Sequence, residues 1–261
     1  ERVPIFSYLK TKIMKRIDLI QLDHSVKIGD NCPYIEPNVT EDSIFYFENE
    51  PIGFYMTKMP EKMCKLADLA NAELRSKNVP KTEMKRSSGM HNTEKEVLQY
   101  STIIGSIPPK PLMRRPYPSI SSVHSVKSAQ TFIKAMLLLA KESEQLIKEI
   151  LPKQYEQQTE LFKEVPDKWK FANLFTSSIS NYNISAPFHR DAGNIVGAVN
   201  VIICKKHNSK GGDLNIPDYG ATIGQQDNSI LVYPAWRNMH GVTPIIPTFE
   251  GGYRNSLVFY P

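Results

Sequence analysis

The chain has 261 residues, of which 41% are hydrophobic and 23% charged, and its formal net charge is +5. This composition is that of an ordinary globular protein and excludes a disordered or fibrous chain. A chain of this length can bury a sizeable core and form one large domain. The mild excess of positive charge permits an anionic partner such as nucleic acid but does not require one.

The cysteines and the absence of long apolar runs bear on the compartment. Cys32, Cys64 and Cys204 are odd in number, widely spaced and outside any CxxC pattern, so they indicate neither a disulfide framework nor a zinc knuckle. No run approaches the roughly 18 apolar residues of a membrane span, and the start, Glu1–Pro4, lacks a signal pattern. We therefore expect a cytoplasmic protein in a reducing setting, with no membrane contact.

Two helices are predicted in the first half from apolar residues at helical spacing. The first begins after Pro60 and fades between residues 76 and 80. The second runs from about Ser128 to Ile150, where Pro152 should end it. Its apolar face consists of Phe132, Met136, Leu139, Ala140, Leu146 and Ile150. We expect this face to pack on a sheet.

Between the two helices lies a proline-rich segment, Ser106–Pro118. Its prolines exclude a regular helix and a central strand, which leaves an extended loop that carries Lys110, Arg114 and Arg115. With Tyr117 beside them, these cations would suit a phosphate backbone and a stacked base. The alternative is an ordinary solvated surface loop.

After Trp169 the pattern changes to short segments rich in β-branched and aromatic residues, separated by turn residues. The candidate strands are Leu174–Ile184, Ile195–Cys204, Gly212–Ile216, Ser229–Tyr233, His240–Pro244 and Arg254–Tyr260. The prediction is an α+β protein with a mainly β core, an antiparallel sandwich or barrel whose one outer face is covered by helices. We expect a single domain over residues 1–261, with a mixed, partly helical portion (1–170) followed by the β core (171–261).

A candidate metal site comes from three residues of this second half. His189 and Asp191 stand two residues apart, and in an extended segment such side chains project to the same side. His240 would supply a third ligand from the edge of a late strand. Two imidazoles and one carboxylate that leave open positions are typical of non-haem Fe(II) oxygenases. The alternatives are a chance HxD sequence and a structural or surface histidine.

Arg254 and Ser256 strengthen the interpretation. They lie on the apolar final strand, fourteen residues and more beyond His240, and their side chains point to the same side. A guanidinium can bind a carboxylate through two parallel hydrogen bonds and a hydroxyl can add a third, which suits the distal carboxylate of 2-oxoglutarate. An inward arginine on such a strand is costly without a partner. The alternative is an exposed arginine on an edge strand.

The order of these motifs resembles that of the Fe(II)/2-oxoglutarate dioxygenases, and within them the TET/JBP group, which has many phage members. The resemblance covers about residues 175–261. The segments that carry it are His189–Asn194, Gly211–Tyr219, His240–Pro244 and Arg254–Ser256. It implies a double-stranded β-helix core of the jelly-roll or cupin-like type and the use of Fe(II), 2-oxoglutarate and O2. If the chain is phage-encoded, its place is the host cytoplasm.

The resemblance also implies roles for single residues. His189, Asp191 and His240 match the iron ligands, Arg254 matches the residue that binds 2-oxoglutarate, and Ser256 would assist it. In the TET/JBP pattern HRDxxN the last residue lies at the target base, and Asn194 occupies that position. Its amide offers a donor and an acceptor for a pyrimidine edge, although an Asn after Gly193 can also simply form a turn.

Three functions therefore compete at this point. The TET/JBP likeness implies hydroxylation of the C5-methyl group of 5-methylcytosine or thymine in nucleic acid, with DNA as the expected partner and the base flipped out or single-stranded. An oxygenase of the same superfamily that acts on a protein side chain or a small molecule would need the same iron residues. A non-catalytic binding module could also keep the β fold.

Overall fold

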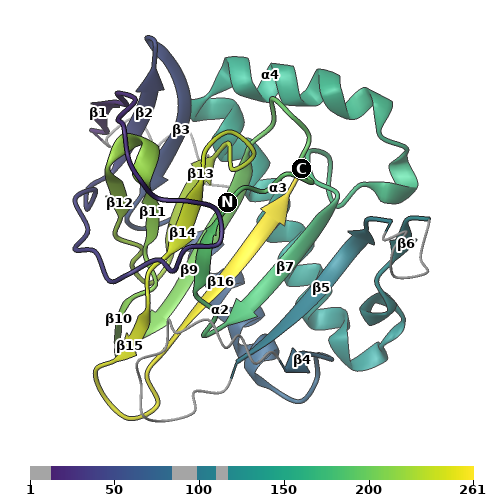
Figure 1. Cartoon of the computed structure of the whole chain (residues 1–261). Helices are drawn as coiled ribbons and strands as arrows, with labels where there is room; N and C mark the ends of the chain where they lie inside the picture. Colours follow the sequence, from purple (N-terminus) through teal and green to yellow (C-terminus); the bar gives the residue numbers. More distant parts are fainter. Residues whose placement is uncertain (1–12, 84–98, 110–116) are drawn as a thin grey trace.

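The computed structural model describes residues 13–83, 99–109 and 117–261, which form two β-sheets with helices against one of them (Figure 1). In spatial order the larger sheet contains β1 (Lys15–Asp18), β2 (Ser43–Phe47), β3 (Glu50–Met56), β13 (Ser229–Tyr233), β9 (Asn200–His207), β16 (Tyr253–Tyr260), β7 (Ser177–Tyr182), β5 (Tyr100–Ile107) and β4 (Thr82–Glu83), with β6 (Ser119–Ile120) beside β5. The smaller sheet contains β12 (Ala221–Ile223), β11 (Leu214–Ile216), β14 (His240–Val242) and β8 (Ala186–His189). A separate ladder pairs β10 (Ser209–Gly211) with β15 (Ile245–Pro247).

The α-helices within the described residues are α2 (Glu61–Arg75), α3 (Gln130–Ile150) and α4 (Pro152–Leu161). Short 3-10 turns occupy Ser122–Ser125, Lys127–Ala129, Phe162–Glu164, Asp167–Trp169 and Pro217–Tyr219. None of the helices in these ranges is long and apolar enough to cross a membrane.

The main hydrophobic core lies between α2, α3 and one face of the larger sheet, and Figure 1 shows both helices behind that sheet. On α3 the buried residues recur at three- and four-residue spacing, among them Phe132, Met136, Leu139 and Ala140. They pack against sheet residues such as Leu257 and Phe259 of β16. Alternate residues of that strand point to the helices. The expected mainly β core with helices on one face is confirmed.

A second core fills the space between the two sheets. Tyr55, Leu231 and Tyr233 extend from the opposite face of the larger sheet and pack against residues of β11 and β12, including Leu214 and Ile216. The two sheets are therefore stacked face to face, as in a β-sandwich. Where the larger sheet is buried on both faces, its strands carry short apolar runs, namely Val201–Ile203 on β9, Ile230–Val232 on β13 and Leu257–Phe259 on β16.

Three features differ from the sequence-based expectation, and a fourth expectation falls on residues that the structure does not describe. Pro152 is the first residue of α4, where its missing N–H is tolerated, so the chain continues as a second helix after α3. The strand expected from Ile195 begins only at Asn200, because residues 191–198 form turns. Strands of the first half, such as β3 and β5, lie in the same sheet as those of the second half. The cations expected on the loop, Lys110, Arg114 and Arg115, lie outside the described residues.

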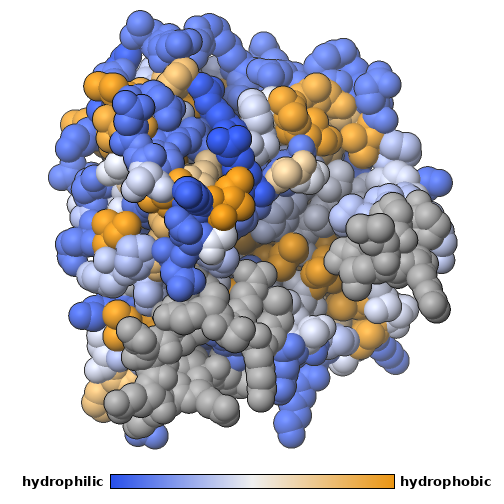
Figure 2. All heavy atoms as spheres, viewed as in Figure 1, coloured by the Kyte–Doolittle hydropathy of each residue, from blue (hydrophilic) through white to orange (hydrophobic). Residues whose placement is uncertain are grey.

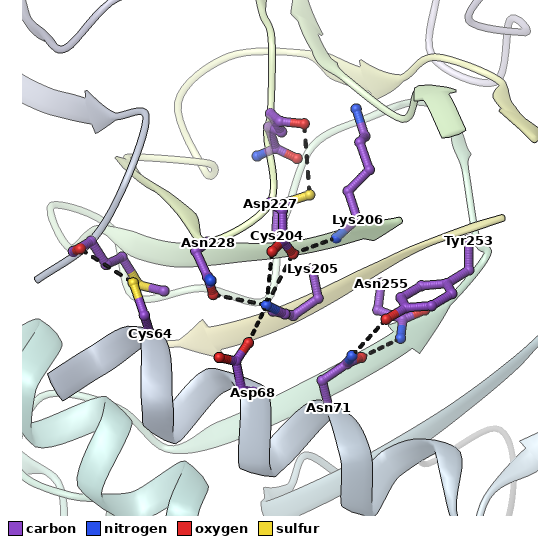
Figure 3. Close-up of polar contacts among 12 residues, drawn as sticks. Cys64, Asp68, Asn71, Cys204, Lys205, Lys206, Asp227, Asn228, Tyr253 and Asn255 are labelled. Carbon is purple, nitrogen blue, oxygen red and sulfur yellow. Dashed lines mark hydrogen bonds and ion pairs between the residues drawn. The ribbon is translucent and has the colours of Figure 1, made fainter. Parts of the chain in front are cut away.

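Polar contacts also tie α2 to the larger sheet (Figure 3). The buried Lys205 ammonium lies 2.5 Å from the Asp68 carboxylate of α2 and 2.9 Å from that of Asp227. Nearby, Asn71 of α2 donates to the Tyr253 hydroxyl at 3.0 Å and accepts from the Asn255 amide at 2.5 Å. These contacts fix the helix against one face of β9 and β16. Residues on the opposite face of these two strands line the cavity described below.

Two adjacent leucines of α3 test the packing of the main core. Leu139 is fully buried, whereas the side chain of Leu138 is exposed. We expect Leu139→Ala to lower the free energy of unfolding by about 2–5 kcal/mol, because it removes buried methyl groups and leaves a cavity. The matched control, Leu138→Ala, should change it by about 0.5 kcal/mol or less. Urea denaturation followed by circular dichroism measures both, and equal losses would contradict the packing.

Candidate active site

The pairing of β8 with β14 brings two histidines of distant sequence together. His189 and His240 are direct cross-strand partners, and their ring centroids lie 4.4 Å apart. Asp191 follows β8, where its backbone N–H donates to the Ala235 carbonyl at 3.2 Å. Its carboxylate oxygens lie 3.5 Å from His189 Nε2 and 3.9 Å from His240 Nε2. One ligand atom from each residue therefore lies within 4.8 Å of the other two, close enough to share one ion.

Backbone carbonyls fix the orientation of both imidazoles. His189 Nδ1 lies 2.7 Å from the Pro187 carbonyl oxygen, and His240 Nδ1 lies 3.1 Å from that of Asn238. Because a carbonyl oxygen only accepts, each Nδ1 carries a proton, which leaves Nε2, the atom nearer to the Asp191 carboxylate, to bind a metal when the ring is neutral. Burial lowers the pKa of His240, and the neighbouring His189 lowers it further. The ring is thus kept neutral, the form that binds a metal.

A chain of two amides leads from the Asp191 carboxylate to Asn194. The fully buried Asn200 donates from Nδ2 to Asp191 Oδ2 at 3.3 Å, and its Oδ1 accepts from Asn194 Nδ2 at 2.6 Å. A carboxylate only accepts, so the orientation of both amides follows from it. The Asn194 backbone N–H also donates to the Asp191 carbonyl at 3.0 Å, which forms the turn expected as the alternative. The side-chain oxygen of Asn194, Oδ1, takes part in neither of these two hydrogen bonds.

A second polar network holds Asn238, the residue whose backbone carbonyl contacts His240. Asn238, whose carbonyl oxygen meets His240 Nδ1, donates from its side chain to Asp218 at 2.5 Å and accepts from the Tyr219 hydroxyl at 3.0 Å. The other oxygen of Asp218 lies 2.7 Å from His24 Nε2. Burial opposes ionisation of Asp218, but the hydrogen bonds from Asn238 and His24 outweigh it and lower the pKa of this carboxyl. The carboxylate can therefore hold the network at neutral pH.

A cavity of about 150 Å³ extends from the histidine pair along β7 and β16. Its walls combine apolar and polar side chains, and Figure 2 shows apolar surface in the recessed region over these strands. Polar groups enter it from six residues: Asn181, His189, Asp191, His240, Arg254 and Ser256. Arg254 and Ser256 point to the same side of β16, as the alternation of a strand predicts. A cavity in which polar groups converge between apolar side chains is typical of a small-molecule site.

Arg254 is buried although it carries a permanent charge. It is 2% exposed, and its Nη2 donates to Gln225 Oε1. Among the described residues, its Nε has no hydrogen-bond partner. Gly212 makes room for the side chain, because a Cβ there would lie 2.9 Å from Arg254 Cγ and Cδ, and its φ of +68° also favours glycine. An unpaired buried N–H costs free energy unless a ligand accepts from it.

These residues fit the groups that the motifs imply. Two neutral imidazoles and a carboxylate form a donor set compatible with Fe(II). The orphan donor of Arg254, with the Ser256 hydroxyl on the same wall, suits a carboxylate at the far end of the cavity.

The structure thus brings five of the six predicted site residues to one cavity, and the sixth, Asn194, lies two hydrogen bonds from Asp191. Sequence reasoning missed Asn200, Asn238 and Gln225. Each of them lies in or beside an apolar strand, where a polar residue is unusual and could have been noticed. The sequence does not show, however, which residue each amide binds.

Comparison with known proteins defines the class. The model of the Tet_JBP family, described as the oxygenase domain of the 2OGFeDO superfamily, matches residues 111–261. The chain is therefore a 2-oxoglutarate-dependent dioxygenase, for which this superfamily implies Fe(II), 2-oxoglutarate and O2. It belongs to the Tet_JBP family. No curated protein matches the chain.

Solved structures are similar to the chain at low sequence identity. NgTET1 in complex with 5mC DNA has a TM-score of 0.59 at 12% identity, and the match covers 92% of this chain and 83% of that one. A 2OG-Fe(II) oxygenase from Burkholderia pseudomallei has a TM-score of 0.43 at 12% identity, covering 80% and 84%. OsALKBH1 has 0.40 at 11%, covering 87% and 100%. With the first of these, the expected double-stranded β-helix is confirmed.

The buried His240 should make the metal-free protein sensitive to acid. We expect the midpoint of its NMR titration to lie below 6.5, the ordinary value, because burial disfavours the charged ring. The unfolded chain then binds more protons, so the free energy of unfolding should decrease as the pH falls below about 6.5 towards the folded pKa. In His240→Gln this dependence should be weaker. A midpoint at or above 6.5 would contradict the assignment.

Proposed function

We propose that this dioxygenase hydroxylates the C5-methyl group of a pyrimidine, 5-methylcytosine or thymine, in DNA. The observation that carries the proposal is that the His189–Asp191–His240 cluster and Arg254 line one cavity, in a member of the Tet_JBP family. The likeness in fold to NgTET1, a protein solved with 5mC DNA, supports DNA as the partner.

In this proposal His189, Asp191 and His240 would hold the Fe(II) ion. When bound, the iron and 2-oxoglutarate supply the oxidising chemistry for an unactivated methyl group. The protein positions the reactants. Asn200 holds one oxygen of Asp191 and so directs the other towards the metal, while the carbonyls of Pro187 and Asn238 orient the imidazoles.

Arg254 would bind the distal carboxylate of 2-oxoglutarate. Its buried Nε has no partner among the described residues, and a charge-assisted hydrogen bond to a carboxylate would satisfy it. Ser256, two residues further along β16 and on the same face, would add a hydroxyl donor. The apolar residues that line the rest of the cavity would exclude water from the co-substrate.

Asn194 would contact the target base. Its Nδ2 is engaged by Asn200, so the atom that it can offer is the acceptor Oδ1. An acceptor suits the exocyclic amino group of cytosine or the N3–H of thymine. The base must leave the duplex to reach the site, or be presented in single-stranded DNA.

The iron assignment predicts the loss of all turnover in two variants. His189→Ala and Asp191→Ala should each abolish Fe(II)-dependent formation of succinate from 2-oxoglutarate, because each removes a ligand of the metal. His207→Ala, which alters an exposed histidine away from the cavity, should retain it. Full turnover in either ligand variant would show that the assignment is wrong.

The substrate is tested by mass spectrometry of nucleosides after incubation with DNA that contains 5-methylcytosine or thymine. We expect a gain of one oxygen on one of these bases, single-stranded or duplex. Asn194→Ala should reduce this product by about tenfold or more, since it removes a hydrogen bond to the base, and should leave some succinate formation uncoupled from it. Succinate formation without any oxidised nucleoside would instead point to a protein or small-molecule substrate.

A further inference from the structure

Two cations are cross-strand neighbours beside the cavity wall that Arg254 forms. Lys206 of β9 is the direct cross-strand partner of Arg254 of β16, so the two side chains start from the same face of the sheet. Figure 3 shows the alternation along β9, since Lys205 points to Asp68 of α2 and Lys206 points away from that helix. The Lys206 side chain is only 15% exposed. Like charges in this arrangement repel each other strongly unless anions compensate them.

One buried carboxylate lies beside this pair. Asp213, whose side chain is 4% exposed, has its Oδ1 at 3.5 Å from Lys206 Nζ. The same oxygen accepts the Gln225 backbone N–H at 3.0 Å, and Gln225 in turn accepts from Arg254 through Oε1. Asp213 follows Gly212, against which the Arg254 side chain lies. The carboxylate is therefore a near neighbour of both cations.

However, only one of the two cations, Lys206, makes an ion pair with Asp213. Asp213 pairs with Lys206, whereas Arg254 has a neutral amide as its partner and makes no ion pair with a carboxylate in the part of the chain that the structure describes. Burial raises the pKa of Asp213, and both Lys206 and Arg254 counteract this. Two positive charges thus face one negative charge in a nearly dry site. The three groups together carry a net positive charge, which one further carboxylate would neutralise.

We propose that Lys206 is a positioning residue for the co-substrate: by pairing with Asp213 it keeps this carboxylate from occupying Arg254, which stays available for the distal carboxylate of 2-oxoglutarate. This inference rests on the proposed function. Without the lysine, Asp213 would be an uncompensated buried charge beside a guanidinium that has a free donor. It would then compete with the co-substrate from within the protein.

The test measures the binding of 2-oxoglutarate by isothermal titration calorimetry with Fe(II) under nitrogen, where no turnover occurs. Lys206→Met keeps the aliphatic chain and should raise Kd by about tenfold or more, whereas Lys206→Arg should remain within about threefold of wild type. The double variant Lys206→Met/Asp213→Asn should return to within about threefold, because the competing charge is gone. Lys210→Met, which removes an exposed lysine of β10, is the matched control and should bind normally.

Two further measurements separate this role from a structural one. The effect of Lys206→Met should vanish with 2-oxopentanoate, which lacks the distal carboxylate, and in turnover KM for 2-oxoglutarate should rise while kcat changes by less than about twofold. An unchanged Kd in Lys206→Met, an equal loss with 2-oxopentanoate, or no recovery in the double variant would each overturn the inference.

If Lys206→Met does not fold, Asp213→Asn decides: because Lys206 already pairs with Asp213 in the wild type, Kd should stay within about threefold or become tighter, and a weaker Kd would contradict the proposal. A wild-type protein that binds no 2-oxoglutarate in the presence of Fe(II) would instead refute the proposed function, and this inference with it.

Discussion

The site depends on the pairing of β8 with β14, because it places His189 directly opposite His240. Cross-strand partners have their side chains on the same face at close distance, so a register shift of one residue would separate the two rings. Asp191 lies close enough to join them because the chain leaves β8 two residues earlier and hydrogen-bonds to the Ala235 carbonyl. Three residues that span half of the β core thus meet within 4.8 Å.

The larger sheet serves two purposes through the alternation of its side chains. On β16, Leu257 and Phe259 point into the core beneath α2 and α3, whereas Arg254 and Ser256 point into the cavity. The neighbouring β9 repeats the division, with Lys205 bound to α2 and Lys206 on the cavity side. Packing of the helices therefore holds the strands that carry the site. A rigid support of this kind keeps buried polar groups in place, where loops alone would not.

Buried polar chains define the orientation of each functional group. Asp191 is held by Asn200, His240 by Asn238, and Arg254 by Gln225. In each case a hydrogen bond to a neighbouring amide or carbonyl group constrains the orientation of the functional group. This order before any ligand binds lowers the entropic cost of binding, which is the basis of preorganisation. The proposed chemistry would use the iron and co-substrate within this prepared frame.

The sequence by itself determined the local periodicities and the short motifs. Helical spacing marked α2 and α3, while the two-residue spacing of His189 and Asp191, with His240, Arg254 and Ser256, indicated an oxygenase site before any coordinates. It did not reveal α4, whose polar residues lack an apolar stripe, or the first-half strands that extend the larger sheet. The partners Asn200, Gln225, Asp213 and Lys206 emerged only in the tertiary structure. Their contacts depend on strand register and on which face of a sheet is buried, and both are decided by long-range pairing that no local pattern encodes.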